Sequence, residues 1–204
     1  MELKGIYAIS DEVLTPYNTI KSQLQEAING GISIFQFRDK SAKDEEIESL
    51  CEELQEICKK NKVLFVLNDR VNLAIKINAQ ALHLGKREDD EPYTKEELLR
   101  VRKKYHGILG ISCYDSENLA QNAKEIGADY VAFGSCFLSA IKPNAKRVNL
   151  SLFTQDFKLP KCAIGGINKD NIKELKNADM VACISSIWQG DIKKNVENLR
   201  KMWK

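Results

Sequence analysis

The sequence predicts an α/β protein in which residues 1–204 form one single-domain (β/α)8 barrel, the TIM-barrel architecture. Eight short and almost wholly apolar segments recur along the chain, helical periodicity fills the gaps between them, and no Gly-, Ser- or Pro-rich linker interrupts the 204 residues. Apolar strands that alternate with helices are typical of a parallel sheet covered on both faces. Eight such units in about 200 residues favour a closed barrel, and a doubly wound open sheet is the alternative.

The strands are the easiest elements to place, because several of them follow the end of a helix and a small or polar turn. This pattern occurs in "AINGGISIFQFR", "KINAQALHLG", "KEIGADYVAFGS" and "KNADMVACISS". Other segments, such as "KVLFVLNDR" and "PKCAIGGIN", end in Asn, Ser, Gly or Asp. The predicted strands lie near residues 4–10, 32–38, 63–68, 80–84, 107–112, 129–134, 161–165 and 180–185.

The gaps between these segments carry helix signals. In residues 43–60, apolar side chains recur at spacings of three and four, which is the period of an amphipathic helix. The segment "DSENLAQNAKEIG" begins with a capping residue, Asp115 or Ser116, and ends at Gly127, where a helix can stop.

The composition and the net charge of the chain argue against some classes of binding partner. The chain is 43% apolar and 29% charged, with a net charge of +2. This balance gives no electrostatic reason to expect nucleic acid or a membrane surface as a partner, and no apolar run approaches the roughly 20 residues that span a bilayer. We therefore expect a cytoplasmic protein with small-molecule partners, and homo-oligomerisation is left open.

The six cysteines form no C-x-x-C pair and are predicted to be reduced core residues.

The second predicted strand ends in the unusual stretch "SIFQFRDKS", residues 33–41. Because side chains alternate along a strand, Gln36, Arg38 and Lys40 fall on one face. One amide and two cations on a single face require an anion or a solvated cleft, since an unpaired buried charge is costly. The C-terminal ends of barrel strands face one pocket, so we expect these three side chains to line it.

Other strand ends extend this pocket. Asp69 and Glu88 offer carboxylate oxygens, which suit Mg²⁺ when substrate phosphate oxygens complete its shell. Together with the cations of Arg38, Lys40 and Lys142, they predict a diphosphate site that uses Mg²⁺.

A second anion site is predicted at the ends of the last two strands. Gly165 and Gly166 follow one strand in "AIGGINKDN", and Ser185 and Ser186 follow the next in "CISSIWQ". Barrels often bind phosphate there through backbone N–H groups and a helix N-terminus. No nucleophile–base pair stands out, and His83 is predicted to support a neighbouring group rather than to transfer a proton.

Seven motifs together give the chain a family resemblance that runs over nearly its whole length. They are "QFRDK" (36–40), "LNDRVNLA" (67–74), "LHLGKRE" (82–88), "GIS" (110–112), "FGSCFLSAIKPNA" (133–145), "AIGGIN" (163–168) and "ISS" (184–186). In these motifs the chain resembles the thiamine-phosphate synthases. The resemblance implies a (β/α)8 transferase that joins hydroxymethylpyrimidine diphosphate to thiazole phosphate, releases pyrophosphate, uses Mg²⁺ and follows a dissociative mechanism.

The resemblance also implies roles for individual residues. Mg²⁺ would be held by Asp69 and Glu88, and catalysis would fall to Arg38, Lys40, Ser112 and Lys142. The thiazole phosphate would be bound by Ser139, Ala140, Ile141, Gly165, Gly166, Ile184 and Ser185. The pyrimidine diphosphate would be bound by Gln36, Phe37, Arg38, Asp39, Lys40, Asn68, Ser112 and Lys142.

The chain departs from the family pattern in three places. Glu88 stands where the family usually has Asp, Lys86 follows Gly85 where the family reads G-Q, and "SAIK" replaces T-x-T-K, so that Ile141 lacks a hydroxyl. Two alternatives stay open beside the synthase: a thiazole tautomerase of the same fold, and a non-catalytic protein that binds thiamine precursors. Lys40 and Asp69, together with Tyr114 where a tautomerase would have His, favour the synthase.

Overall fold

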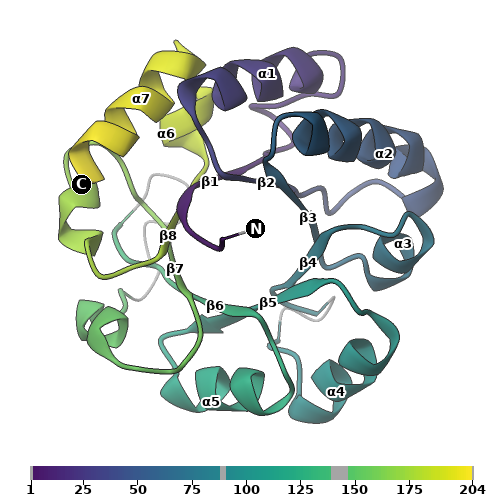
Figure 1. Ribbon diagram of the computed structural model, residues 1–204, viewed down its shortest axis with the longest axis vertical. Helices are drawn as coiled ribbons and strands as arrows, with labels where there is room; N and C mark the ends of the chain where they lie inside the picture. Colours follow the sequence, from purple (N-terminus) through teal and green to yellow (C-terminus); the bar gives the residue numbers. More distant parts are fainter. Residues whose placement is uncertain (1, 88–90, 139–146, 204) are drawn as a thin grey trace.

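The computed structural model describes residues 2–87, 91–138 and 147–203. Eight parallel strands pair in chain order, and β8 pairs with β1, so the sheet is a closed barrel. In Figure 1, which looks into the barrel, the strands form an inner ring and the helices surround it. The closure excludes the open doubly wound sheet, because an open sheet would leave two edge strands unpaired. The predicted (β/α)8 fold is therefore confirmed.

Each strand lies within or overlaps the segment that the sequence predicts for it. All eight are short, and most are buried along their whole length, as expected when a sheet is covered on both faces. The strands are β1 (Gly5–Ile9), β2 (Ile34–Phe37), β3 (Leu64–Asn68), β4 (Ala81–Leu84), β5 (Ile108–Tyr114), β6 (Tyr130–Phe133), β7 (Lys161–Ile164) and β8 (Met180–Cys183).

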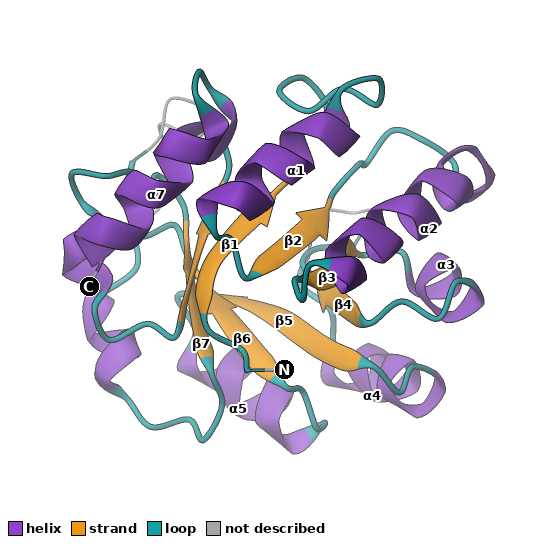
Figure 2. Cartoon of the chain, turned by 45° about the horizontal axis from the view of Figure 1, so that its top comes forward, coloured by secondary structure: helices purple, strands orange, loops and turns teal. Residues whose placement is uncertain are grey.

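The helices cover the outside of the barrel, as the tilted view in Figure 2 shows. Ser116 caps one of them by accepting a 3.2 Å hydrogen bond from the Leu119 N–H, and Gly127 follows it with a positive φ of 79°, as predicted. The α-helices are α1 (Ile20–Gly30), α2 (Asp44–Lys60), α3 (Val71–Lys76), α4 (Lys95–Lys104), α5 (Glu117–Glu125), α6 (Ser185–Trp188) and α7 (Ile192–Trp203).

The connections after β6 and β7 differ from the expected helices. Within the described residues they contain only the 3₁₀ turns η1 (Leu150–Thr154) and η2 (Ile172–Leu175). The apolar side chains of these turns still reach the core: Leu152, Phe153 and Ile172 are buried. Short turns therefore cover this part of the sheet as longer helices do elsewhere.

Two sets of buried side chains hold the barrel together. The larger set fills the space between the strands and the surrounding helices. The smaller set lies inside the ring of strands and includes Tyr7, Val66, Tyr130 and Met180, with Leu3 packed against it from the N-terminal segment. In Figure 1 the segment that precedes β1 lies inside the ring of strands. The interior is thus a packed core, and the strand ends are left to form a site.

The cysteines contribute to these cores. All six are free and buried, as the sequence predicts. None of the helices in the described parts of the chain is long and apolar enough to span a bilayer.

Candidate active site

The carboxyl ends of the parallel strands gather the predicted site residues at one rim of the barrel. The residues come from β2 to β5 on one side and from β7 and β8 on the other, and these two groups face each other across the ring in Figure 1. Those that the structure describes are Gln36, Phe37, Arg38, Asp39, Lys40, Asn68, Asp69, Ser112, Gly165, Gly166, Ile184 and Ser185.

Asp69 is held in a defined position at this rim. It follows β3 in the left-handed region, with φ of 60°, and its backbone N–H donates to the His83 carbonyl over 2.9 Å. Its Oδ1 accepts a 2.7 Å hydrogen bond from the Gly85 N–H, and its Oδ2 accepts one of 2.7 Å from the Asn68 amide. Each carboxylate oxygen keeps a lone pair for a further partner.

Two cations lie within electrostatic range of this carboxylate. Burial raises the pKa of Asp69 above its ordinary value, while the charges of Lys40 and Arg38 act in the opposite direction. Arg38 is half-buried and Lys40 is exposed. Within residues 2–87, 91–138 and 147–203, neither side chain has a hydrogen-bond or ion-pair partner. The rim therefore carries uncompensated positive charge beside a carboxylate, which suits an anion bound together with a metal ion.

The loop that carries Lys40 is clamped by Arg70. The guanidinium donates to the Asp44 carboxylate over 2.6 Å, to the Asp39 carbonyl over 2.9 Å and to the Ala42 carbonyl over 2.7 Å. Arg70 thus ties the turn after β2 to the start of α2, so the Lys40 backbone is fixed although its side chain is exposed.

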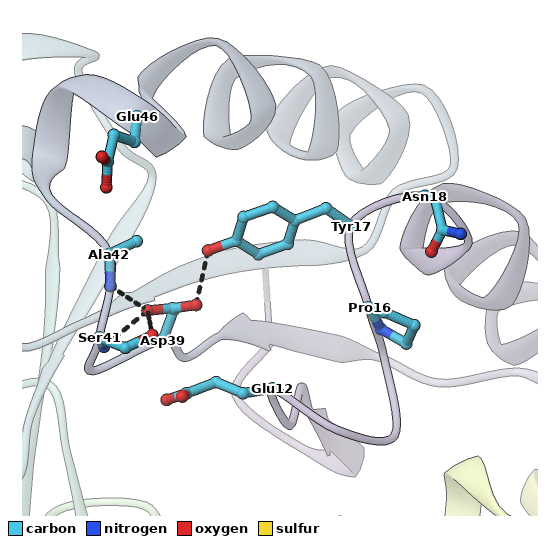
Figure 3. Close-up of a pocket in the computed structure, with 8 residues that line it drawn as sticks. All are labelled: Glu12, Pro16, Tyr17, Asn18, Asp39, Ser41, Ala42 and Glu46. Atoms are coloured by element: carbon cyan, nitrogen blue, oxygen red, sulfur yellow. Dashed lines mark hydrogen bonds between the residues drawn. The ribbon is translucent and has the colours of Figure 1, made fainter.

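Asp39 belongs to the same clamp. Its carboxylate accepts hydrogen bonds from the Tyr17 hydroxyl over 2.6 Å and from the Ser41 and Ala42 N–H groups over 2.8 Å each, as Figure 3 shows. Burial alone would raise its pKa, but these bonds lower it below the ordinary value. Its contacts are those of a loop brace, and the buried Phe37 beside it packs in the outer core. A direct contact of either residue with substrate stays a prediction.

A cavity of about 610 Å³ opens next to this loop. Its walls carry the carboxylates of Glu12, Asp39 and Glu46 and the hydroxyl of Tyr17, and Figure 3 shows the Tyr17 hydroxyl pointing at the Asp39 carboxylate. Three acidic side chains would repel a diphosphate. The cavity is therefore a neighbour of the predicted anion site rather than the site itself.

Inside the barrel, a row of polar side chains links five strands. The Gln36 amide nitrogen donates to the Tyr7 hydroxyl over 2.7 Å, and the Tyr7 and Tyr130 hydroxyls are 2.9 Å apart. The Tyr130 hydroxyl lies 3.0 Å from His83 Nδ1, and His83 Nε2 lies 2.9 Å from Ser112 Oγ. We call this row the interior chain.

The environment of His83 suits its predicted supporting role. Burial lowers the pKa of its imidazole to about 4, so the ring is neutral near pH 7. Its ring stacks on that of Tyr130, with centroids 5.5 Å apart. The other histidine, His106, is exposed. Both nitrogens of His83 are occupied within the interior chain, which makes it a link between neighbours.

The second predicted anion site lies at the ends of β7 and β8. The Phe137 N–H donates to the Gly165 carbonyl over 2.9 Å, which aligns the chain after β6 with the loop after β7. Gly166 has φ of 63°, and a Cβ there would lie 2.4 Å from the Leu138 carbonyl oxygen. Only glycine fits this turn. The helix expected to begin near Ser185 is the four-residue α6, so the predicted contribution of a helix N-terminus is weak.

Several predicted residues lie outside the described parts of the chain. They are the metal-site residue Glu88, the catalytic Lys142 and the thiazole-phosphate residues Ser139, Ala140 and Ile141.

Cys113 and Cys136 stand near the rim, where a thiol nucleophile would be placed. Both are buried, and burial raises the pKa of each thiol to about 12. A thiolate is the nucleophilic form of cysteine, so neither thiol is prepared for covalent catalysis.

Comparison with known proteins decides the family. A family model described as thiamine monophosphate synthase matches residues 6–187. The chain belongs to the thiamine monophosphate synthase family. The family prediction made from its motifs is confirmed.

Individual relatives support the same family assignment. A thiamine-phosphate synthase of Wolinella succinogenes is 43% identical, over an alignment that covers 100% of this chain and 96% of the relative. Another, from Thioalkalivibrio sulfidiphilus, is 36% identical over 91% of this chain and 88% of its own. The solved structure of thiamine phosphate pyrophosphorylase from Pyrococcus furiosus superimposes with a TM-score of 0.84 and 32% identity, over 98% of this chain and 96% of that one.

Three residues of the site were missed by sequence reasoning. Arg70 stands in the quoted motif "LNDRVNLA", but no role was given to it. Tyr7 and Tyr130 fall on the inward face of their strands, where alternation alone predicts apolar packing. Their bond joins residues 123 positions apart, so no local pattern could have revealed it.

Proposed function

We propose that this chain is a transferase that joins 4-amino-2-methyl-5-hydroxymethylpyrimidine diphosphate to a thiazole phosphate, giving thiamine phosphate and pyrophosphate. The observation that carries the proposal is that the Asp69 carboxylate lies near the cations of Arg38 and Lys40, which have no side-chain partner among the described residues. The chain's relatives, matched over nearly their full length, bear the name thiamine-phosphate synthase. A diphosphate with its metal ion satisfies both kinds of charge.

The proposed reaction is dissociative. The C–O bond between the pyrimidine methylene carbon and the diphosphate breaks first, and the electron pair leaves with the diphosphate oxygen. Arg38 and Lys40 stabilise the negative charge that develops there, and preorganised charges of this kind usually contribute most to lowering the barrier of such a step. The thiazole nitrogen then forms the new C–N bond with the pyrimidine methyl cation. No covalent intermediate with the protein is needed, in agreement with the buried cysteines.

The residues present fit a magnesium ion. Asp69 supplies hard carboxylate oxygens, and the described residues contain no group of three His, Cys, Asp or Glu that could enclose a metal. An ion held by one or two carboxylates and by substrate phosphate oxygens is typical of Mg²⁺. Asp69 would hold it, with Glu88 as the second predicted ligand. When bound, Mg²⁺ would neutralise charge on the diphosphate.

The two substrates would lie on opposite sides of the rim. Gln36, Asn68 and Ser112 line the side of β2 to β5 and would orient the pyrimidine. Gly165 and Gly166 lie at the end of β7, where backbone can approach a phosphate closely. This separation leaves the bond-forming atoms between the two sites, as a condensation requires.

Tyr114 supports a synthase rather than a tautomerase. Its hydroxyl donates a 2.9 Å hydrogen bond to the Gly85 carbonyl, so it braces the segment that binds Asp69. A tautomerase would need a proton-transfer group at this position.

The test is pyrophosphate release from the paired substrates, with and without Mg²⁺. We expect release only when both substrates and the metal are present. Each substrate alone serves as a control for hydrolysis. A chain that binds both substrates without releasing pyrophosphate would overturn the proposal and indicate a binding protein.

A further inference from the structure

The interior chain has two ends, and both belong to the predicted pyrimidine site. Gln36 on β2 is 3% exposed, whereas Ser112 on β5 is half-buried and open toward the rim. Between them stand Tyr7, Tyr130 and His83, none of which the proposed mechanism uses. A row of hydrogen bonds that leads from one substrate residue to another can transmit a constraint between them.

The direction of the hydrogen bonds follows from the Gln36 end. The Gln36 amide nitrogen can only donate, so the Tyr7 oxygen accepts. The Tyr7 proton must then go to its remaining partner, Tyr130. The Tyr130 proton in turn goes to His83 Nδ1, which must be unprotonated in order to accept it.

The same argument continues to the other end. A neutral imidazole without a proton on Nδ1 carries it on Nε2, so Nε2–H donates to Ser112 Oγ. The Ser112 oxygen is then an acceptor inside the barrel, and its own proton is free to point elsewhere. The reverse direction would leave the buried Tyr7 hydroxyl accepting two hydrogen bonds while its proton had no acceptor.

The location of Ser112 shows where that proton can be used. A Cβ built on Gly85 would lie 3.8 Å from Ser112 Oγ and 3.7 Å from both oxygens of Asp69. The serine hydroxyl thus borders the same small space at the rim as the Asp69 carboxylate.

We propose that Tyr7 and Tyr130 are positioning residues that hold His83 in the Nε2–H tautomer and thereby present Ser112 to the substrate as a hydrogen-bond donor. The inference rests on the proposed function for the identity of the substrate. It adds that the substrate atom facing Ser112 is an acceptor, such as a ring nitrogen or a phosphate oxygen. A substrate that placed an N–H donor there would be disfavoured.

The tautomer can be measured without any substrate. The chain contains two histidines, and His106 is exposed, so ¹⁵N-histidine labelling gives two resolvable rings. In two-bond ¹H–¹⁵N spectra of the wild type at neutral pH, we expect His83 to be protonated on Nε2 alone. Protonation on Nδ1, or on both nitrogens, would overturn the proposal, and this arm needs no variant to fold.

Two matched variants test the link. Tyr130→Phe removes the partner of Nδ1, so we expect a mixture of His83 tautomers. Tyr105→Phe removes a buried hydroxyl that donates to the Ala79 carbonyl outside the interior chain, so we expect the His83 signals to be unchanged. An unchanged His83 spectrum in Tyr130→Phe would overturn the proposal.

A double-mutant cycle tests whether the chain acts through Ser112. Loss of one oriented hydrogen bond should lower kcat for pyrophosphate release about fivefold to tenfold in Tyr130→Phe, and by less than about twofold when Ser112→Ala is already present. Tyr105→Phe should keep kcat. If Tyr130→Phe lowered kcat by the same factor with and without Ser112→Ala, the proposal that the interior chain acts through Ser112 would be overturned. If the wild type released no pyrophosphate, the proposed function would fail, while the tautomer measurement would still decide the direction of the chain.

Discussion

Aspartates stand at both rims of the barrel, and their surroundings differ. At the amino-terminal rim, Asp129 exchanges two 2.8 Å hydrogen bonds with the backbone of Leu109, and Asp179 does the same with Lys161 at 2.9 and 2.8 Å. At the carboxyl rim, Asp69 lies near the cations of Lys40 and Arg38, whose side chains have no partner in the part of the chain that the structure describes. The first pair directly precede strands and join them to their neighbours, whereas Asp69 directly follows a strand. Position relative to the strand, rather than residue type, separates the structural from the chemical carboxylate.

Of the four substitutions that follow, Asp69→Asn is expected to lower turnover most. Loss of a main electrostatic group should lower pyrophosphate release by on the order of 10²-fold or more. Asn can accept only one of the two hydrogen bonds that the Asp69 oxygens receive, but burial disfavours the ionised carboxylate, so the two effects oppose each other and the variant should have a stability close to that of the wild type without Mg²⁺. Thermal unfolding should show a Mg²⁺-dependent rise in Tm for the wild type only. Normal turnover by Asp69→Asn would show that Asp69, like Asp129 and Asp179, has only a structural role.

Lys40→Ala tests the cationic half of the carboxyl rim. Charge-assisted hydrogen bonds contribute roughly 1.5–3 kcal/mol, so affinity for the pyrimidine diphosphate should fall about ten- to a hundredfold. Thiazole phosphate affinity should be unchanged, because Gly166 lies across the ring. Calorimetric titration of each ligand measures both values, with Lys104→Ala on the outer face of α4 as the control. Equal losses for both ligands would show that the two sites are not separate.

Arg70 lies at the carboxyl rim, but its hydrogen bonds are those of a structural residue, and Arg70→Lys tests that role. Lysine cannot reproduce the planar set of bonds to Asp44, Asp39 and Ala42. We expect a loss of about 1–3 kcal/mol in the free energy of unfolding and a rise in KM for the diphosphate substrate with a smaller change in kcat. Denaturant unfolding and steady-state kinetics measure these effects. A change in kcat alone would indicate that Arg70 acts on the reacting groups.

The smallest effect is expected at the amino-terminal rim. Asp179→Ala removes one hydrogen bond to the Lys161 N–H and should cost about 1 kcal/mol of stability. Turnover at a temperature well below Tm should match that of the wild type. A loss of turnover without a loss of stability would show that the two rims are coupled.

The strands can be predicted from the sequence because both of their signals, the turn residues before a strand and the apolar run within it, are local. "GADY" and "NADM" mark strand starts at the amino-terminal rim, and a buried parallel strand must be apolar on both faces. The position of Asp69 could be predicted for the same reason, since strand ends of a barrel converge. The true surroundings of Asp39 could not, because they depend on where the Tyr17 and Arg70 side chains reach after folding. The direction of the interior chain depends on contacts between distant strands, which no window of sequence contains.

Gly110 in the motif "GIS" gains a specific meaning from the interior chain. A Cβ at this position would lie 2.0 Å from the Tyr130 ring, so the phenol can cross the barrel only because residue 110 has no side chain. The side chains that fit at positions 110 and 130 therefore depend on each other. Among descendants of a common ancestor, a larger residue at 110 should be accompanied by a smaller one at 130, and such lineages should have lost the link to His83 as well.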